Sequence, residues 1–174
     1  VALIDVGCSA GLNLNLDCFG ITYLRDGVQA VLGERHSPLQ INCELRGAKP
    51  LATHPSPAVV ARVGIDLNPI DVSDDADARW LRACIWPDQP ERIERLNAAI
   101  ALSVAAPPPF VAGDAVEVLP DAPALVPEGA LAVGTTPRAL AHFPLGDRPR
   151  FPRPLADAPG PRPTARVGAV GGGP

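Results

Sequence analysis

The chain opens with Val1-Ala-Leu-Ile-Asp-Val-Gly-Cys-Ser-Ala-Gly-Leu-Asn-Leu14, and this stretch decides the fold. Its first six residues form an apolar run that is interrupted only by Asp5, which is typical of a buried strand. A glycine turn follows at Gly7 to Gly11, and the leucine spacing after it predicts a helix. A strand that enters a helix through such a turn lets a ligand approach bare backbone beside the positively polarised helix start. The opening stretch therefore predicts an α/β fold that binds a nucleotide-like molecule.

The spacing of the glycines separates the chemistries that use such a turn. The dinucleotide fingerprint G-x-G-x-x-G needs a glycine at its third position, which is Ser9 in this chain. The phosphate-binding loop needs a lysine after its last glycine, but the only lysine is Lys49. The acid-x-G-x-G-x-G pattern of S-adenosylmethionine-dependent methyltransferases fits Asp5, Gly7 and Gly11, with the small serine in place of the middle glycine. The spacing thus favours a site for S-adenosylmethionine.

The same turn also matches the nucleophile elbow of α/β-hydrolases. Gly7-Cys-Ser-Ala-Gly11 is a literal G-x-S-x-G, and the order Ser, Asp, His can be filled by Ser9, Asp114 and His142. Asp5 argues against this interpretation, because an elbow needs no carboxylate two residues before its first glycine. A serine hydrolase that uses Ser9 is therefore the alternative, and a non-catalytic Rossmann-like binding domain is a third hypothesis.

Composition narrows the class of partner. The chain has 174 residues, of which 47% are hydrophobic, and this is enough for one domain with a sizeable core. Its net charge of −4 argues against nucleic acid, and its apolar runs are too short for a membrane span. Four cysteines without a C-x-x-C pair are typical of a reducing cytoplasm, and the histidines lack metal-ligand spacing. We expect a cytoplasmic protein with a small-molecule ligand, and the sequence leaves its oligomeric state open.

The rest of the chain predicts alternating strands and helices. Apolar runs bounded by turn residues indicate strands at 38–44, 109–112, 130–134 and 164–169. Two capped segments within 73–104 predict a helical insertion, with a start at Ser73 to Asp75, a second cap at Asp88, and Trp80 and Trp86 as core anchors. Residues 144–174 are rich in proline, arginine and glycine, and we expect a poorly ordered end. The prediction is one Rossmann-like domain over 1–174 with a mostly parallel sheet.

Several longer strings resemble a known bacterial family. They are Val6-Gly-Cys-Ser-Ala-Gly-Leu-Asn-Leu14, Cys43-Glu-Leu-Arg-Gly47, Arg62-Val-Gly-Ile-Asp-Leu-Asn-Pro-Ile-Asp71, Trp80-Leu-Arg-Ala-Cys-Ile-Trp-Pro-Asp-Gln89 and Gly113-Asp114. Together they resemble the family catalogued as domain of unknown function 2332, over nearly the whole chain. The family has no established activity to carry over. Its members look longer at the N-terminus, and this chain opens on a core strand without methionine, so we expect a fragment of a longer domain.

The acids fall where a methyl-donor site needs them. Ligands of doubly wound sheets lie over the carboxyl ends of the strands. In methyltransferase-like proteins an acid after the second strand binds the ribose hydroxyls, and an acid after the third binds the adenine amino group. Thr135 and Thr136, after the fourth strand, would face the donor methyl group. We therefore predict that S-adenosylmethionine is bound by Asp5, Gly7, Ser9, Gly11, Glu44 and Asp114.

A loop at Asn68-Pro69 is flanked by Asp66 and Asp71. It is either a lid that closes over the site or an ordinary capped turn. A lid has to lie beside the glycine turn, so a position of Asp66 and Asp71 far from Gly7 and Gly11 would exclude the lid.

Overall fold

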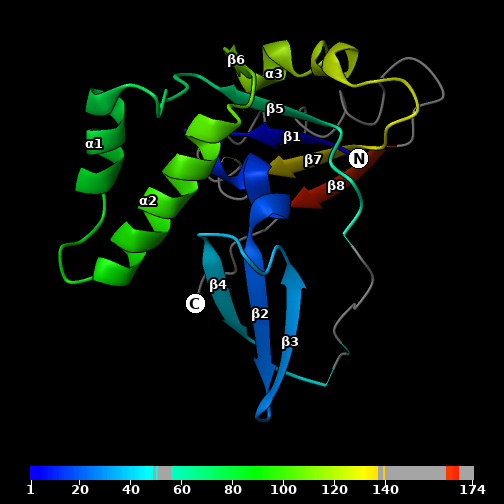
Figure 1. Cartoon of the computed structure of the whole chain (residues 1–174). Helices are drawn as coiled ribbons and strands as arrows, with labels where there is room; N and C mark the ends of the chain where they lie inside the picture. The colour runs from blue at the N-terminus through cyan, green and yellow to red at the C-terminus, as the bar shows by residue number, and fades with distance from the viewer. Residues whose placement is uncertain (49, 51–55, 137–138, 140–163, 169–174) are drawn as a thin grey trace. The chain divides into compact units, whose positions relative to one another are not determined.

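The structure is a computed structural model that describes residues 1–48, 50, 56–136, 139 and 164–168. The chain divides into two compact units, each with its own sheet (Figure 1). The first unit takes Val1–Leu14, Val59–Asp71 and Pro107–Pro174, and the second takes Asn15–Ala58 and Val72–Ala106. From its length alone, the sequence predicts one domain over 1–174.

The first unit is built on a parallel sheet of five strands in the order β6-β5-β1-β7-β8. The strands are β1 (Ala2–Val6), β5 (Ala61–Asp66), β6 (Phe110–Ala112), β7 (Ala132–Thr136) and β8 (Thr164–Gly168). Every neighbouring pair is parallel, so all five carboxyl ends lie at the same edge. The predicted α/β class with a parallel sheet is confirmed.

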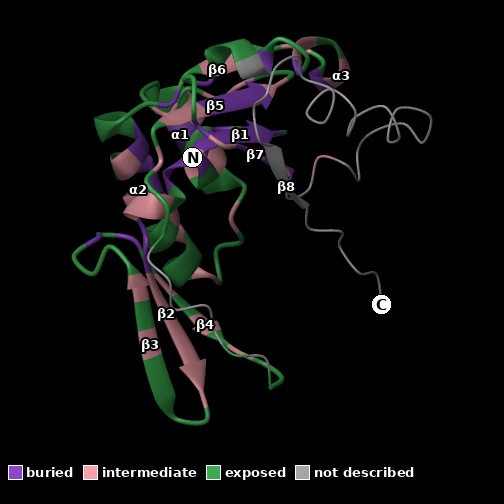
Figure 2. Ribbon diagram, turned by 90° about the vertical axis from the view of Figure 1, so that its right-hand side faces the viewer, coloured by how far each residue is buried: buried purple, intermediate pink, exposed green. Residues whose placement is uncertain are grey.

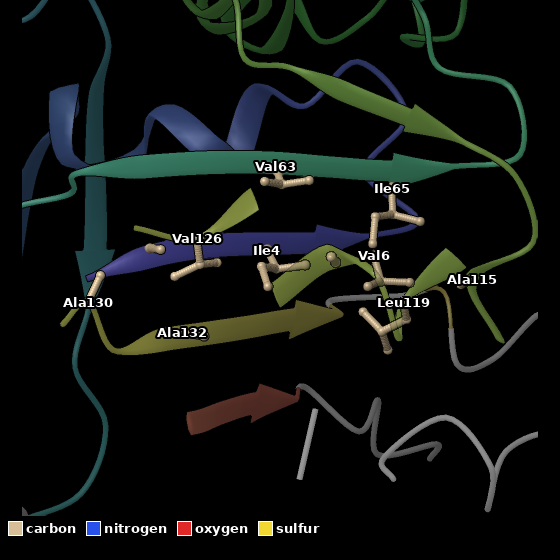
Figure 3. Close-up of a cluster of buried hydrophobic side chains, with 11 residues drawn as sticks. Ile4, Val6, Val63, Ile65, Ala115, Leu119, Val126, Ala130 and Ala132 are labelled. Atoms are coloured by element: carbon tan, nitrogen blue, oxygen red, sulfur yellow. The ribbon is translucent and has the colours of Figure 1, made fainter. Parts of the chain in front are cut away.

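The core of this unit lies on one face of the sheet. All five residues of β1 are buried, and their side chains alternate between the two faces. Ile4 and Val6 pack with Val63 and Ile65 against Leu119, which follows the short helix α3 (Ala115–Val118) (Figure 3). The helix η2 (Ala122–Leu125) extends this cover. Asp5 lies between Ile4 and Val6 and therefore faces the opposite side.

The second unit contains a smaller mixed sheet in the order β3-β2-β4. Strand β2 (Gly20–Arg25) pairs antiparallel with β3 (Val28–Gly33) and parallel with β4 (Gln40–Glu44). Asp26 and Gly27 make the hairpin turn, with φ of 50° and 78°. Positive φ at both positions is the type I′ geometry, for which Asp-Gly is a strong sequence signal. No hairpin was predicted at this position from the sequence.

Two α-helices of the second unit lie where the sequence predicts the helical insertion. Helix α1 (Asp75–Ala83) begins after Asp74, whose carboxylate accepts hydrogen bonds from the amides of Ala76 and Asp77. Helix α2 (Pro90–Ala105) begins after Gln89, so the cap predicted at Asp88 is wrong. The reason is that Pro90 fixes the backbone of the first turn, and Gln89 is the residue that precedes it.

The prediction that the two tryptophans anchor the core is also wrong. Trp80 is 64% exposed and Trp86 is 69% exposed, so neither is a core anchor. Each helix buries only a few side chains, which are Ala78 on α1 and Ala99, Ile100 and Ser103 on α2. A further difference lies at Leu12–Cys18, which forms the 3-10 helix η1 with a kink at Asn15 rather than an α-helix.

Two strand assignments differ from the prediction in a way that matters for the site. The predicted second strand forms β4, but β4 belongs to the sheet of the second unit. The strand that pairs with β1 is β5, which the sequence analysis missed. The proposed poorly ordered end, 144–174, lies outside the described residues except for β8. Among the helices that the structure describes, none combines the length and apolar character needed to cross a membrane.

Candidate functional site

The glycine turn is held against β5 by its own backbone. Gly7 N and Cys8 N both donate to Ile65 O, at 2.8 and 3.2 Å, and Gly11 N donates to Cys8 O at 2.8 Å. Backbone φ is positive at Gly7 (71°), Ser9 (55°) and Gly11 (64°). A non-glycine residue in this region is uncommon, so Ser9 marks a strained point of the turn.

Asp66 ends β5 and lies directly beside this turn. Its Oδ2 accepts a hydrogen bond from Ser9 N at 2.7 Å, and its Oδ1 accepts one from Asn68 N at 3.0 Å. Ser9 O in turn accepts from Ile70 N at 3.1 Å. The loop that begins at Asp66 is therefore tied to the glycine turn on both sides of Ser9. Asp66 therefore lies beside the turn, as a lid requires, and its bond to Asn68 N is equally that of a capped turn.

The two glycines are in contact with protein atoms where a side chain would project. A Cβ on Gly11 would lie 2.8 Å from Cε1 of the Phe110 ring and 3.2 Å from Cγ of Pro108. A Cβ on Gly7 would clash with the Cβ of Ala139. Both positions thus need glycine for the turn conformation and for the packing of Phe110 and Ala139. Their requirement for glycine is explained without a ligand.

Asp5 is a buried carboxyl group at the carboxyl end of the central strand. It is 1% exposed, and its Oδ1 accepts a hydrogen bond from Thr135 Oγ1 at 2.8 Å. Its Oδ2 is buried without a hydrogen-bond partner among the described residues. Burial raises the pKa of Asp5, the Thr135 hydrogen bond lowers it, and the charge of Asp66 raises it further. The site therefore contains a carboxyl group that retains its proton more readily than an exposed aspartate.

Cys8 lies in the glycine turn and is buried, which disfavours the charged thiolate form. Burial raises the pKa of its thiol to about 12, and the nearby charges of Asp5 and Asp66 act in the same direction. The thiolate is the reactive form of cysteine, so the raised pKa makes Cys8 unreactive at neutral pH.

The two remaining predicted site residues, Asp114 and Glu44, belong to different units. Asp114 follows β6 in the first unit, as predicted, where it is exposed and caps α3 by accepting from Val116 N at 2.8 Å. Glu44 ends β4 in the second unit, so it does not end the second strand of the parallel sheet. The strand-end argument that selected Glu44 is wrong, and it selects Asp66 when it is applied to the observed strands.

A signal for β5 was present in the sequence. The run from Ala61 to Asp66 is short, largely apolar and ends in an acid, as the first strand does. Arg62 obscured it, since a charge near the start of a buried strand is uncommon. In the structure the guanidinium is accommodated because Arg62 Nε donates to Leu14 O at 2.9 Å.

The hydrolase hypothesis has no described histidine in the first unit. His36 lies in the second unit, and both His142 and His54 lie outside the described residues. Within the described part of the chain, no cluster of three or more His, Cys, Asp or Glu side chains is arranged to hold a metal ion.

Comparison with curated proteins found no match, and comparison with solved structures found none either. One family model, described as an uncharacterized protein conserved in bacteria and numbered as domain of unknown function 2332, matches residues 1–171. The match agrees with the resemblance seen in the glycine turn and in the strings that include Asp66 and Trp80. Because the match spans nearly the whole sequence, the chain belongs to this bacterial family.

Proposed function

We propose that the first unit binds S-adenosylmethionine and that the protein is a methyltransferase. Numbered along the chain, the five parallel strands have the order 3-2-1-4-5, which is the order of a Rossmann-like doubly wound sheet. Ligands of such sheets bind outside the carboxyl ends of the strands, at the point where the strand order reverses. Here that point lies between β1 and β7, where Asp5 and Thr135 meet.

The observation that carries the proposal is the placement of Asp66. Its carboxylate stands at the carboxyl end of the strand next to β1 and is oriented by the amides of Ser9 and Asn68. A carboxylate offers about four acceptor sites, so two hydrogen bonds leave capacity for two ribose hydroxyls. We assign to Asp66 the ribose contact that the sequence analysis gave to Glu44.

Two further acids, Asp114 and Asp5, lie at strand ends of the same sheet. Asp114 follows the third strand, where an acid suits the adenine amino group, and Asp5 offers an unpartnered buried oxygen. Gly7 and Gly11 already contact protein atoms, so the proposal does not rest on close approach of the ligand to them. When bound, S-adenosylmethionine would supply a methyl group activated on a sulfonium. The protein's share is then orientation of donor and acceptor.

Titration calorimetry with S-adenosylhomocysteine and S-adenosylmethionine tests this proposal. We expect Asp66→Asn to weaken binding by about 1.5–3 kcal/mol, the range for hydrogen bonds to a charged group. Glu44→Gln is the matched control, because it removes an acid from a strand end of the other sheet and should leave binding unchanged. Circular dichroism establishes that each variant is folded. Absence of heat from both ligands with folded wild-type protein would reject the proposal, and equal losses in the two variants would reject the role of Asp66.

One observation keeps the serine hydrolase as a second candidate. Ser9 is exposed and has a positive φ of 55°, and a nucleophile elbow also holds its serine on a strained turn after a strand. Against it stands Asp5, because a nucleophile elbow needs no carboxylate two residues before its first glycine. A fluorophosphonate probe separates the two functions, and we expect no labelling. Stoichiometric labelling that disappears in Ser9→Ala would instead establish a hydrolase.

A further inference from the structure

The two outer strands of the sheet in the second unit differ in how they are protected. Strand β4 follows Pro38, and the exposed side chains along it are polar. Its exposed face borders an open cavity of about 510 Å³ beside the charged side of α2. The cavity is lined by Pro38, Gln40, Asn42, Glu91, Glu94 and Arg95. Strand β3 reads Val-Gln-Ala-Val-Leu-Gly, without a charge or a proline. Proteins usually protect an outer strand by a charge, a proline or a bulge, and the continuous register of β3 with β2 excludes a bulge.

The hydrogen-bonding groups of β3 can be assigned from the hairpin. In a hairpin with a two-residue turn, the residues that flank the turn form a hydrogen-bonded pair, and the bonded pairs then alternate. Arg25 and Val28 flank the turn, so the bonded residues of β3 are Val28, Ala30 and Leu32. The bond from Glu34 N to Phe19 O continues this alternation. The backbone N–H and C=O groups of Gln29 and Val31 therefore point away from β2, toward an edge that no other described strand covers.

We propose that β3 pairs antiparallel with β3 of a second copy of this chain, across a two-fold axis at Val31. This pairing joins two sheets of three strands into one continuous sheet and satisfies the outward groups of Gln29 and Val31 in both copies. Val31 is 37% exposed and Val28 is 70% exposed, so apolar surface is available for burial. Strand β3 carries no charge, so no like charges come opposite each other within the paired strands.

Two further features fit a second copy as the occupant. With the axis at Val31, and the register continued past the end of β3, Asp26 of each copy comes toward Arg35 of the other copy, so an acid lies near a base at both ends of the paired strands. Val28 and Ala30 share a sheet face with Tyr23, directly opposite Ala30, and this face has a shallow apolar cavity of about 260 Å³. Pairing extends that apolar face across both copies. Because β3 bonds to β3, each copy uses the same edge of its sheet, and assembly closes at a dimer.

Sedimentation equilibrium of the full chain with a pair of charge variants tests the proposal. We expect wild-type protein to be a dimer, and Val31→Lys and Val31→Glu to be monomers when each is alone, because like charges then lie directly opposite. An equimolar mixture of the two variants should recover the dimer. Val31→Thr is the matched control, since it keeps the β-branched shape without a charge and should remain dimeric.

A second variant guards against loss of folding. Val31→Pro removes an outward N–H that has no partner in β2, so it should give a folded monomer, with the fold checked by circular dichroism. A monomeric wild-type protein would overturn the proposal. So would a dimer that persists in Val31→Lys, or growth into larger assemblies, which indicates pairing between unlike edges.

Discussion

The two sheets of this protein differ in how far their strands are buried. In the parallel sheet, β1 is buried along its whole length, whereas in the mixed sheet no residue of β3 or β4 is buried (Figure 2). Parallel sheets are normally covered on both faces, because their crossover connections run over them. A polar group buried in such a sheet is oriented by its hydrogen-bond partner, as Thr135 orients the carboxyl group of Asp5. Ligand chemistry is therefore expected in the first unit and chain association in the second.

The largest effect should separate two glycines that have similar conformations, one in each unit. Gly11→Ala combines an unfavourable φ of 64° with a clash against Phe110, and Gly27→Ala has a φ of 78° but nothing within 4 Å. We expect Gly11→Ala to lower the free energy of unfolding by about 2–5 kcal/mol, from strain together with overpacking. Gly27→Ala should cost only the strain, about 1–2 kcal/mol.

Urea denaturation of both variants gives the two free energies. Because the strain is shared, the difference between them measures the packing of Phe110 against the turn. Equal losses would show that the turn tolerates a methyl group and that Gly11 is needed for its conformation alone.

Local features of both units were predictable from the sequence, and pairing between distant segments was not. The run before Gly7 indicates a buried strand through hydrophobicity alone, and Asp74 indicates a helix start through its own hydrogen bonds. The strand that ends at Glu44 was assigned to the wrong sheet, because nothing within 38–44 states which strand it pairs with. That pairing depends on the hairpin at Asp26, which brings β2 into position beside β4.

In the candidate site, too, local features were predictable and contacts between distant residues were not. The acid before the glycine turn was identified from spacing, because Asp5 and Gly7 are neighbours in sequence. The contact between Ser9 and Asp66 joins residues 57 positions apart, and no pattern near either residue encodes it. The exposure of Trp80 was missed for a related reason, since α1 buries only Ala78 and amphipathic spacing does not state how deep a helix packs.

A smaller effect is expected from the two aspartates that cap helices. Asp74 accepts two amide hydrogen bonds at the start of the nine-residue α1, and Asp114 accepts one at the start of the four-residue α3. Asp74→Ala should lower the free energy of unfolding by about 1 kcal/mol, and Asp114→Ala by less.

Ligand binding then separates the roles of these caps. If Asp114 contacts the adenine group, Asp114→Ala weakens the binding of S-adenosylhomocysteine in calorimetry, and Asp74→Ala does not. Unchanged binding in Asp114→Ala would leave Asp114 with the capping role alone.

The smallest change is expected from Asp5→Asn in acid, and its growth with pH is the informative quantity. The pKa of Asp5 is raised above its ordinary value of 3.8, chiefly by burial, so the folded state holds this proton more tightly than the unfolded state. The stability that this proton provides is fully present below pH 3.8 and is lost as the pH rises through the raised pKa. Asparagine does not titrate, and its Oδ1 can still accept the hydrogen bond from Thr135. The variant should therefore match wild type at low pH and become relatively more stable as the pH rises. Asp88→Asn removes an exposed carboxylate of the second unit and is the control in denaturation across pH. If both variants respond alike, the effect belongs to net charge and the burial of Asp5 is not its cause.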